Sequence, residues 1–381
     1  MINDAAYWIA VSQLTGWKHE RLNNLIIRFF HEQKIQLADF FHLSENDWRS
    51  GYQLKEKEIS DLLQVKSEIA NNSFLAETLY NQGYEIIPIT SAEYSRTLKR
   101  NLKIQYSPAV LYIKGNKQIL SEKSIAIVGS RNASDLSLEF TDNIAKLASR
   151  EYKVIVSGFA KGVDKQALDS AIKYKGQSII VLPQGILTFG SGFKTYYRQI
   201  VDGDVLVLST FFPKTPWRTD LAMARNPVIY GLANEIYVAE SSDKGGTWSG
   251  VADGLRKNRI IYVRKPEKPE QNANMLLLQK GAIPVDFNGN VLPVMYSEPN
   301  VFKENGTVSE PEESFDDIIR NLLKNKPLTS KEILDKIDGG WTLSQLKRHL
   351  KTLDYIEIAK KGGDNLYKLT GTPGNTDLKL F

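Results

Sequence analysis

The 381-residue chain contains no cysteine and only four histidines. Without thiols it forms no disulfide, no thiolate metal site and no cysteine nucleophile. The histidines stand at positions 19, 31, 42 and 349, so residues 43–348 have no imidazole. A Ser-His-Asp triad or an HExxH zinc site is therefore excluded from that region. Catalysis there would depend on carboxylates, lysines, tyrosines or bound ions.

Long apolar runs are also missing. No stretch reaches the roughly 18 uninterrupted apolar residues of a membrane span, and the first residues lack the pattern of a secretory signal. We therefore expect a cytoplasmic protein with no membrane partner. A hydrophobic content of 42% and a charged content of 24% are typical of a globular chain. The net charge of +5 favours an acidic partner without identifying it.

Four patterns follow one another along the chain. Residues 1–80 contain no proline and show helical apolar spacing, which predicts a small all-helical (SAM-like) domain. Residues 81–300 alternate buried strands with helices, which predicts an α/β domain with a doubly wound, mostly parallel Rossmann-like sheet. Residues 301–314 are polar and acidic, as in a linker. Residues 315–381 predict three short helices and a β-hairpin around Gly362 and Gly363, the pattern of a winged-helix domain with a tail.

Continuous apolar runs locate the individual strands of the predicted sheet. They lie at residues 84–89, 109–113, 124–128, 153–156, 177–181, 205–208, 235–238 and 259–263. Helices are expected at 134–149 and 163–174, after the third and fourth of these runs. Ser134 is placed to cap the first of these two helices.

Three glycine-rich loops follow predicted strands, and each precedes a helix. In doubly wound sheets, ligands bind beyond the carboxyl ends of the strands. We therefore expect backbone N–H groups at three helix N-termini to point into one crevice and to bind a phosphate, with Arg131 and Lys161 beside it. One such loop is equally compatible with an ordinary turn, whereas three favour anion binding. The loop residues are Gly129, Ser130 and Arg131; Ser157, Gly158, Lys161 and Gly162; and Lys244, Gly245, Gly246 and Thr247.

Two common nucleotide-binding motifs are missing from the sequence. No GxGxxG follows the first strand of the parallel series, and no GxxxxGK[ST] occurs, which disfavours a dinucleotide cofactor and a P-loop ATPase. We expect neither a cofactor nor a metal.

The run YEIIPIT…SPAVLYIKGN…SIAIVGSRNAS over residues 84–134 and the motif SGFAKGVD at 157–164 carry a specific resemblance. The chain resembles the DprA/Smf family of DNA-processing proteins, and the order of its predicted domains is similar nearly throughout. The resemblance implies binding of single-stranded DNA, a homodimer formed through the Rossmann-like domain, loading of a RecA-type recombinase during natural transformation, and no enzymatic activity. It also implies that Arg131 and Lys161 contact DNA phosphates, joined by Arg225 and Asn226.

Later motifs depart from the family pattern. Leu168 replaces a histidine, Ser209-Thr210 replaces Ser-Glu, Pro227 replaces the second arginine of Arg-Asn-Arg, and residues 245–248 replace Ser-Gly-Ser-Leu. A nucleotide-sensing or phage-defence protein that binds a free nucleotide is therefore an alternative, as is a scaffold with a vestigial pocket. A nucleoside monophosphate hydrolase is disfavoured, since Gly250 and Val251 stand where its PGGxGTxxE signature has glutamate. Phe159 and Trp248 are candidates for base stacking or for core packing.

Overall fold

The structure is a computed structural model that describes residues 2–293 and 315–370, the latter with gaps at 325, 338–342, 351–352, 354 and 362–363. The chain divides into two compact units, Met1–Tyr296 and Ser297–Phe381, and each is described by itself. The expected linker at 301–314 and the glycines at 362–363 lie outside the described residues. Within the described residues, every helix is too short or too polar to cross a membrane.

The first unit begins with helices that pack onto the sheet. Trp48 is fully buried there and donates its indole N–H to the Phe40 carbonyl at 3.0 Å. The Ser12 hydroxyl lies 2.8 Å from that of Tyr112 in the second strand, so the helices share one core with the sheet. The predicted domain boundary near residue 80 stays a prediction. The helices are α1 (Ile2–Ser12), α2 (His19–Ile26), α3 (Leu37–His42), α4 (Glu56–Ser67) and α5 (Ile69–Asn81), with π-helical segments at Ile27–Glu32 and Asp47–Gly51.

A nine-stranded sheet in the order β1-β2-β6-β5-β4-β3-β7-β8-β9 forms the centre of the unit. All neighbours from β6 to β9 pair in parallel, whereas β1 and β2 join antiparallel. The predicted mostly parallel doubly wound sheet is confirmed. The strands are β1 (Tyr84–Pro88), β2 (Val110–Lys114), β3 (Ser124–Gly129), β4 (Val154–Ser157), β5 (Ser178–Val181), β6 (Val205–Ser209), β7 (Glu235–Glu240), β8 (Ile261–Arg264) and β9 (Ile283–Val285). The sequence patterns missed β9, because three residues around a proline carry no strand signal.

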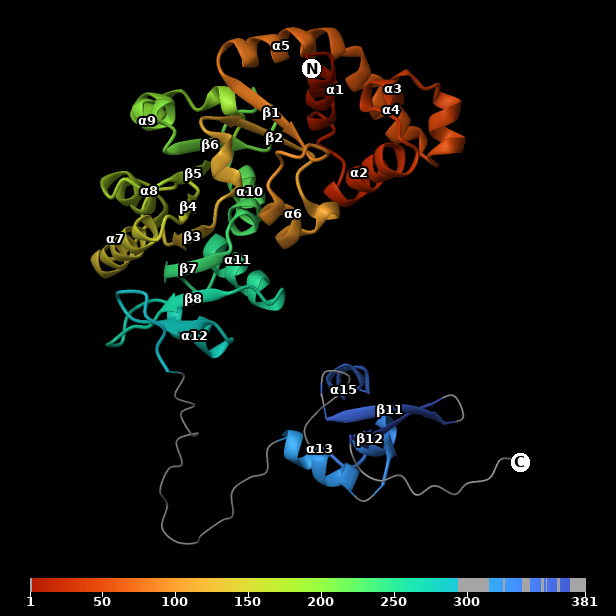
Figure 1. The fold of residues 1–381 in the computed structure, drawn as a ribbon, viewed down its shortest axis with the longest axis vertical. Coiled ribbons are helices and arrows are strands. Elements are labelled where there is room, and N and C mark those ends of the chain that lie inside the picture. The colour runs from red at the N-terminus through yellow and green to blue at the C-terminus, as the bar shows by residue number, and fades with distance from the viewer. Residues whose placement is uncertain are drawn as a thin grey trace. The chain divides into compact units, whose positions relative to one another are not determined.

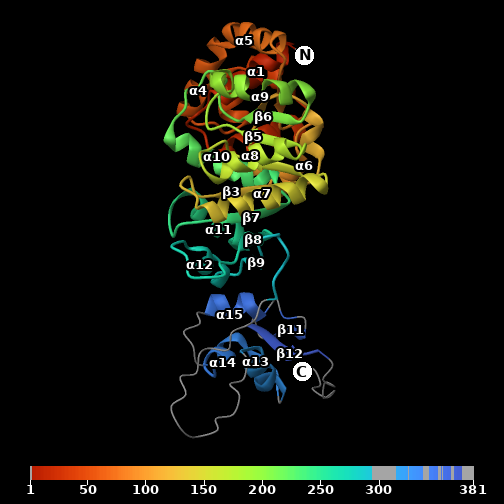
Figure 2. The same ribbon diagram turned by 90° about the vertical axis from the view of Figure 1, so that its left-hand side faces the viewer.

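Helices cover both faces of this sheet, which explains why its strands are apolar on both sides. Figures 1 and 2 show α7 (Asp135–Arg150), α8 (Val163–Lys173) and α9 (Gly190–Asp202) on one face. The opposite face carries α6 (Arg96–Leu102), α10 (Thr219–Leu232) and α11 (Gly245–Arg256), and α12 (Asn274–Gln279) contacts β8. Short 3₁₀ segments lie at Ile104–Tyr106, Lys117–Ser121 and Ile186–Thr188.

The second unit is a small α/β fold with its own core. Its antiparallel sheet has the order β10-β12-β11, and Ile319, Leu346 and Tyr367 are fully buried against it. Its elements are α13 (Phe315–Lys324), β10 (Leu328–Thr329), α14 (Ser330–Leu334), α15 (Leu343–Leu350), β11 (Ile356–Lys361) and β12 (Asp364–Leu369). This arrangement is compatible with the predicted winged helix, which stays a prediction.

Candidate anion-binding site

The candidate site lies where the strand order reverses. From β3 the chain proceeds through β4, β5 and β6 on one side, and from β7 through β8 and β9 on the other. The loops that follow β3 and β7 therefore diverge and leave a crevice at the carboxyl edge of the sheet. A cavity of about 340 Å³, the strand-tip pocket, occupies this crevice. Of the predicted site residues, its lining includes Gly129, Ser130, Arg131, Arg225, Asn226, Lys244, Gly245, Gly246 and Thr247.

Gly162 holds the first loop against the second. Its φ of +85° is a conformation that side chains rarely adopt, and a Cβ there would lie 2.3 Å from the Ser130 carbonyl oxygen. This close approach lets the Val163 N–H donate to the same oxygen at 3.2 Å. On the other side, the Thr247 hydroxyl donates to the Gly129 carbonyl at 3.1 Å. The loop that carries Arg131 is thus fixed from two directions.

Arg225 forms the inner wall of the strand-tip pocket. Its side chain from α10 is almost fully buried, and Nη1 donates to the Gly158 carbonyl at 2.7 Å and to the Val181 carbonyl. A Cβ on Gly158 would lie 2.3 Å from Nη1, so only glycine leaves room for the guanidinium. Its Nε–H is buried without a hydrogen-bond partner. The guanidinium therefore has a buried N–H group that lacks the hydrogen bond buried donors usually form.

Charge at the pocket wall is only partly balanced. Burial lowers the pKa of Arg225, the nearby Asp164 opposes this shift, and the positive charge of Arg131 reinforces it. Burial raises the pKa of Asp164, and Arg225 opposes that shift in turn. One carboxyl thus faces two guanidinium groups at the pocket. An anion bound there would complete the charge balance.

Three exposed cations surround the strand-tip pocket. Arg131 and Lys244 line it, and Lys161 lies one loop away. Within the described residues, none of the three side chains forms an ion pair. Arg218, by contrast, is paired with Asp220 at 2.9 Å. The three unpaired cations are available to an anionic ligand.

Lys161 and Gly158 line a second cavity of about 370 Å³, the side cavity, which shares Arg131 and Arg225 with the strand-tip pocket. The remaining two predicted residues contact neither cavity. Ser157 is fully buried and donates its hydroxyl to the Ile127 carbonyl at 3.1 Å. Gly162 lies beneath the Ser130 loop. Both residues therefore support the loops of the site without lining either cavity.

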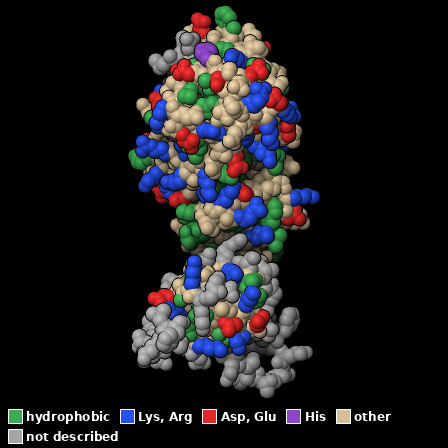
Figure 3. All heavy atoms as spheres, turned by 90° about the vertical axis from the view of Figure 1, so that its right-hand side faces the viewer, with side chains coloured by type: hydrophobic (Ala, Val, Ile, Leu, Met, Phe, Trp, Pro, Cys, Tyr) green, Lys and Arg blue, Asp and Glu red, His purple; other side chains and the backbone are tan. Residues whose placement is uncertain are grey.

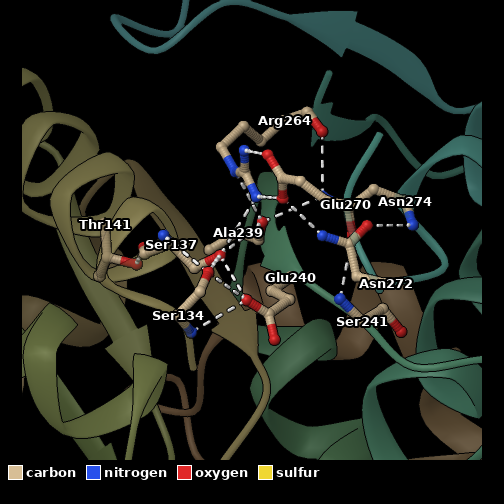
Figure 4. Close-up of polar contacts among 10 residues, drawn as sticks. All are labelled: Ser134, Ser137, Thr141, Ala239, Glu240, Ser241, Arg264, Glu270, Asn272 and Asn274. Carbon is tan, nitrogen blue, oxygen red and sulfur yellow. Dashed lines mark hydrogen bonds and ion pairs between the residues drawn. The ribbon is translucent and has the colours of Figure 1, made fainter. Parts of the chain in front are cut away.

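The expectation that three helix N-termini face the crevice is wrong for α7. The Glu240 carboxylate at the end of β7 accepts hydrogen bonds from the Ser134 N–H at 3.0 Å, the Ser134 hydroxyl at 2.6 Å and the Ser137 hydroxyl at 2.7 Å (Figure 4). A negative side chain thus already occupies this positive helix end. The predicted cap is confirmed, since Ser134 accepts from the Ser137 N–H at 3.3 Å. The N-terminus of α11, at Gly245–Thr247, does line the strand-tip pocket.

A buried ion pair between Arg264 and Glu270 holds the end of β7, which carries Glu240. Arg264 of β8 is fully buried, donates Nε to the Ala239 carbonyl at 3.1 Å and pairs with Glu270 at 2.8 Å through Nη1 (Figure 4). Its Nη2 also lies 3.3 Å from the Ser137 hydroxyl. This pair ties the ends of β7 and β8 to the start of α7. It keeps the loop after β7 in place at the strand-tip pocket.

We expect Glu270→Gln to destabilise the protein by about 3 kcal/mol, because removing one partner leaves a buried guanidinium uncompensated. The Arg264 hydrogen bonds lower the pKa of Glu270, so its contribution is present above the ordinary glutamate value of 4.5 and lost as the pH falls through the lowered value. Urea denaturation at pH 7 and at acidic pH measures both effects. The exposed neighbour Glu267, changed to Gln, is the control. Equal stability of the two variants would contradict the role of the pair.

The sequence model of the family described as DNA recombination-mediator protein A matches residues 85–293, more than half of the chain. The protein belongs to this family. The chain is 31% identical over 208 residues to the DNA processing protein DprA of Bacillus subtilis, covering 53% of this chain and 68% of that one. It is 30% identical over 161 residues to the DNA processing protein DprA of Streptococcus pneumoniae, covering 42% of this chain and 56% of that one. This region of the chain thus matches a little over half to two thirds of these relatives.

A solved structure agrees with the family membership at the level of the fold. The X-ray structure of DprA from Streptococcus pneumoniae superposes with a TM-score of 0.61 at 23% identity. The superposition covers 74% of this chain and 94% of that one. The architecture of the first unit is therefore that of the recombination-mediator family.

The departures from the family pattern fall at structurally defined places. Leu168, which replaces a histidine, is fully buried in the core between α8 and the sheet. Pro227, expected from the resemblance to stand in place of an arginine, lies within α10 directly after Asn226, which lines the strand-tip pocket. Val251, which with Gly250 was expected where the hydrolase signature has glutamate, is fully buried.

Aromatic side chains line the side cavity. Phe159 lines this cavity and packs edge-to-face on Phe189 at 5.1 Å and on Tyr196 at 5.6 Å. Trp217, which sequence reasoning missed, also lines this cavity with 54% of its surface exposed. Trp248, by contrast, lines neither of these two cavities. The sequence feature that could have indicated Trp217 is the position of this tryptophan in a polar loop, between Pro216 and Arg218.

Proposed function

We propose that this protein binds single-stranded DNA by its phosphate backbone, without catalysing a reaction, and supports recombination during natural transformation in the cytoplasm. The observation that carries the proposal is the set of three unpaired cations, Arg131, Lys161 and Lys244, around a pocket at the switch point of the sheet. Such cations with backbone N–H groups bind phosphates without regard to sequence. The names of the DprA relatives, DNA processing proteins, support the same conclusion.

Each part of the site has a role in this proposal. Arg131 and Lys161 contact successive phosphates, and the open N-terminus of α11 at Gly245 donates backbone N–H groups to one of them. Arg225 is buried behind them and holds the loop of Gly158 in position. Trp217 at the side cavity offers an exposed ring for a base to stack on. A homodimer and a RecA-type recombinase partner belong to the proposal and stay predictions.

A binding role is favoured over hydrolysis because Asp164 and Glu240 are both engaged within the protein. Asp164 lines the strand-tip pocket and faces Arg225. Glu240 accepts three hydrogen bonds at the start of α7, and Val251 offers no carboxylate. The alternative is a protein that binds a free nucleotide in the strand-tip pocket, whose volume of about 340 Å³ is sufficient for one.

Fluorescence-anisotropy titrations with labelled oligothymidylate and with a duplex of equal length, at two salt concentrations, test the proposal. We expect tighter binding of the single strand, because the recessed pocket admits one backbone but not a duplex. Three phosphate contacts predict a slope of log K against log salt of about −2, at roughly −0.7 for each contact on a single strand. Tight binding of thymidine monophosphate, with no gain for the oligonucleotide, would favour the alternative. No binding to either DNA would refute the proposal.

A further inference from the structure

A second basic surface lies at the opposite edge of the sheet, ahead of β7 and β8. There a cavity of about 880 Å³ is lined by Arg100 and Lys103 at the end of α6 and by Arg256, Lys257 and Arg259 at the end of α11. We call it the basic groove. None of its lining residues is an aspartate or a glutamate. These two groups of cations are more than 150 residues apart in sequence and meet because α6 and α11 cover the same face (Figure 1).

The positive charges of the basic groove are largely unbalanced. Arg259 donates to the Tyr230 carbonyl at 3.0 Å and to the Ala233 carbonyl at 2.6 Å, so it caps the end of α10 with neutral acceptors. Burial and the neighbouring charge of Arg100 both lower the pKa of Arg259. Arg100 and Lys103 are exposed and form no ion pair within the described residues.

Two acidic residues lie near the groove in the described part of the chain. Glu20 accepts a hydrogen bond from the hydroxyl of Tyr106, which lines the groove, at 3.1 Å. Asp253 pairs with Arg256 at 3.3 Å and with Lys257 at 2.7 Å, and it neutralises one of the two charges. Both pairs are solvent-exposed, so each contributes little stability and opens readily for a competing anion. Arg100, Lys103 and one cation of α11 are thus available to a ligand.

A connecting cavity of about 270 Å³ joins the basic groove to the strand-tip pocket. It shares Asn226, Tyr230 and Gly246 with the strand-tip pocket, and Asn101, Arg256 and Arg259 with the basic groove. The three cavities therefore adjoin along the face formed by α10 and α11. Figure 3 shows the molecule from this side, with Lys and Arg side chains across the middle of the main body.

We infer that the basic groove is a second phosphate-binding site for the same DNA strand, which leaves the strand-tip pocket, follows the α10–α11 face and reaches Arg100 and Lys103. The inference rests on the proposed function. Tyr106 and Ile260, each 47% exposed, line the groove and provide apolar surface for bases beside its cations. A long strand thus contacts both edges of the sheet, and a short strand contacts one.

The test measures affinity for oligothymidylates of about 4 to about 30 nucleotides, a range that brackets known single-strand sites. Arg100→Glu combined with Lys103→Glu is expected to weaken binding of the longest strand about tenfold and to leave the shortest strand within about twofold of wild type. Loss of two phosphate contacts is expected to make the salt slope for the long strand shallower by about 1.4. Circular dichroism melting verifies that the variant is folded.

Arg150→Glu combined with Lys175→Glu is the matched control, since both residues are exposed and unpaired within the described part of the chain, on the α7–α8 side of the sheet. It is expected to bind both strands as the wild type does, within about twofold. Wild-type affinity and slope in the Arg100/Lys103 variant, or an equal loss in the control, would overturn the inference and leave the proposed function standing. A wild-type protein that binds no oligothymidylate of any length would overturn both.

Discussion

Replacing Arg131 with alanine is expected to weaken binding of single-stranded DNA at least about tenfold, and replacing it with glutamate about a hundredfold. Alanine removes a charge-assisted contact worth about 1.5–3 kcal/mol. Glutamate adds repulsion from the phosphate. The side chain is exposed and forms no ion pair within the described residues, so the fold does not depend on it. Anisotropy titration at constant salt measures the effect.

The effect of Arg131 is separable from a general loss of positive charge. Arg150→Ala removes an exposed arginine on another part of the first unit and is expected to leave affinity unchanged. The Arg131→Ala salt slope is also expected to be shallower by about 0.7, the value for one phosphate. Wild-type affinity in Arg131→Ala would show that the strand-tip pocket does not hold the DNA.

The second large effect is expected at Gly162. Alanine there would place a Cβ 2.3 Å from the Ser130 carbonyl oxygen and 2.6 Å from that of Arg131, in a backbone conformation with φ of +85°. The backbone strain and the clash with two backbone oxygens together predict a loss of about 3 kcal/mol in stability. Because the loop with Arg131 must move away, DNA affinity is expected to fall at least about tenfold as well.

Gly281→Ala is the control for strain alone. Gly281 has a φ of +96° but no atom within 4 Å of its Cβ position. The Gly281→Ala variant is expected to lose about 1 kcal/mol in free energy of unfolding and to keep the wild-type DNA affinity. Urea denaturation and anisotropy on the same preparations compare the two variants. If Gly162→Ala resembled Gly281→Ala in both measurements, the packing of the two loops would not be what positions Arg131.

Sequence patterns predicted the parallel sheet well because strand signals are local. Runs such as Ile125–Val128 and Val205–Leu208 are apolar at every position, and this requires helices on both faces. They appear as β3 and β6 within one residue. The loop glycines were predicted for the same reason, since a tight strand-to-helix turn is encoded at the turn itself. Within the nine-stranded sheet, β9 with its three residues was the strand that left no readable pattern.

The chemistry of the strand tips was harder to predict, because it depends on pairs that are distant in sequence. Glu240 and Ser134 are separated by 106 positions, and no spacing rule indicated that this carboxylate would cap α7. Gly158 and Arg225 are 67 positions apart, and their contact explains a glycine that the sequence showed only as part of a glycine-rich loop. Strand order, which sequence patterns do not give, brings each pair together.

The sequence by itself determined where strands, helices and glycine turns occur, because hydrophobic periodicity and backbone freedom act over a few neighbouring residues. It also placed Arg131 and Lys161 on loops that follow parallel strands. Only the tertiary structure decided that α11 rather than α7 offers a free helix end, and that Arg100 and Arg259 meet in a basic groove. Electrostatic contacts act through space, so they depend on which elements the fold places side by side.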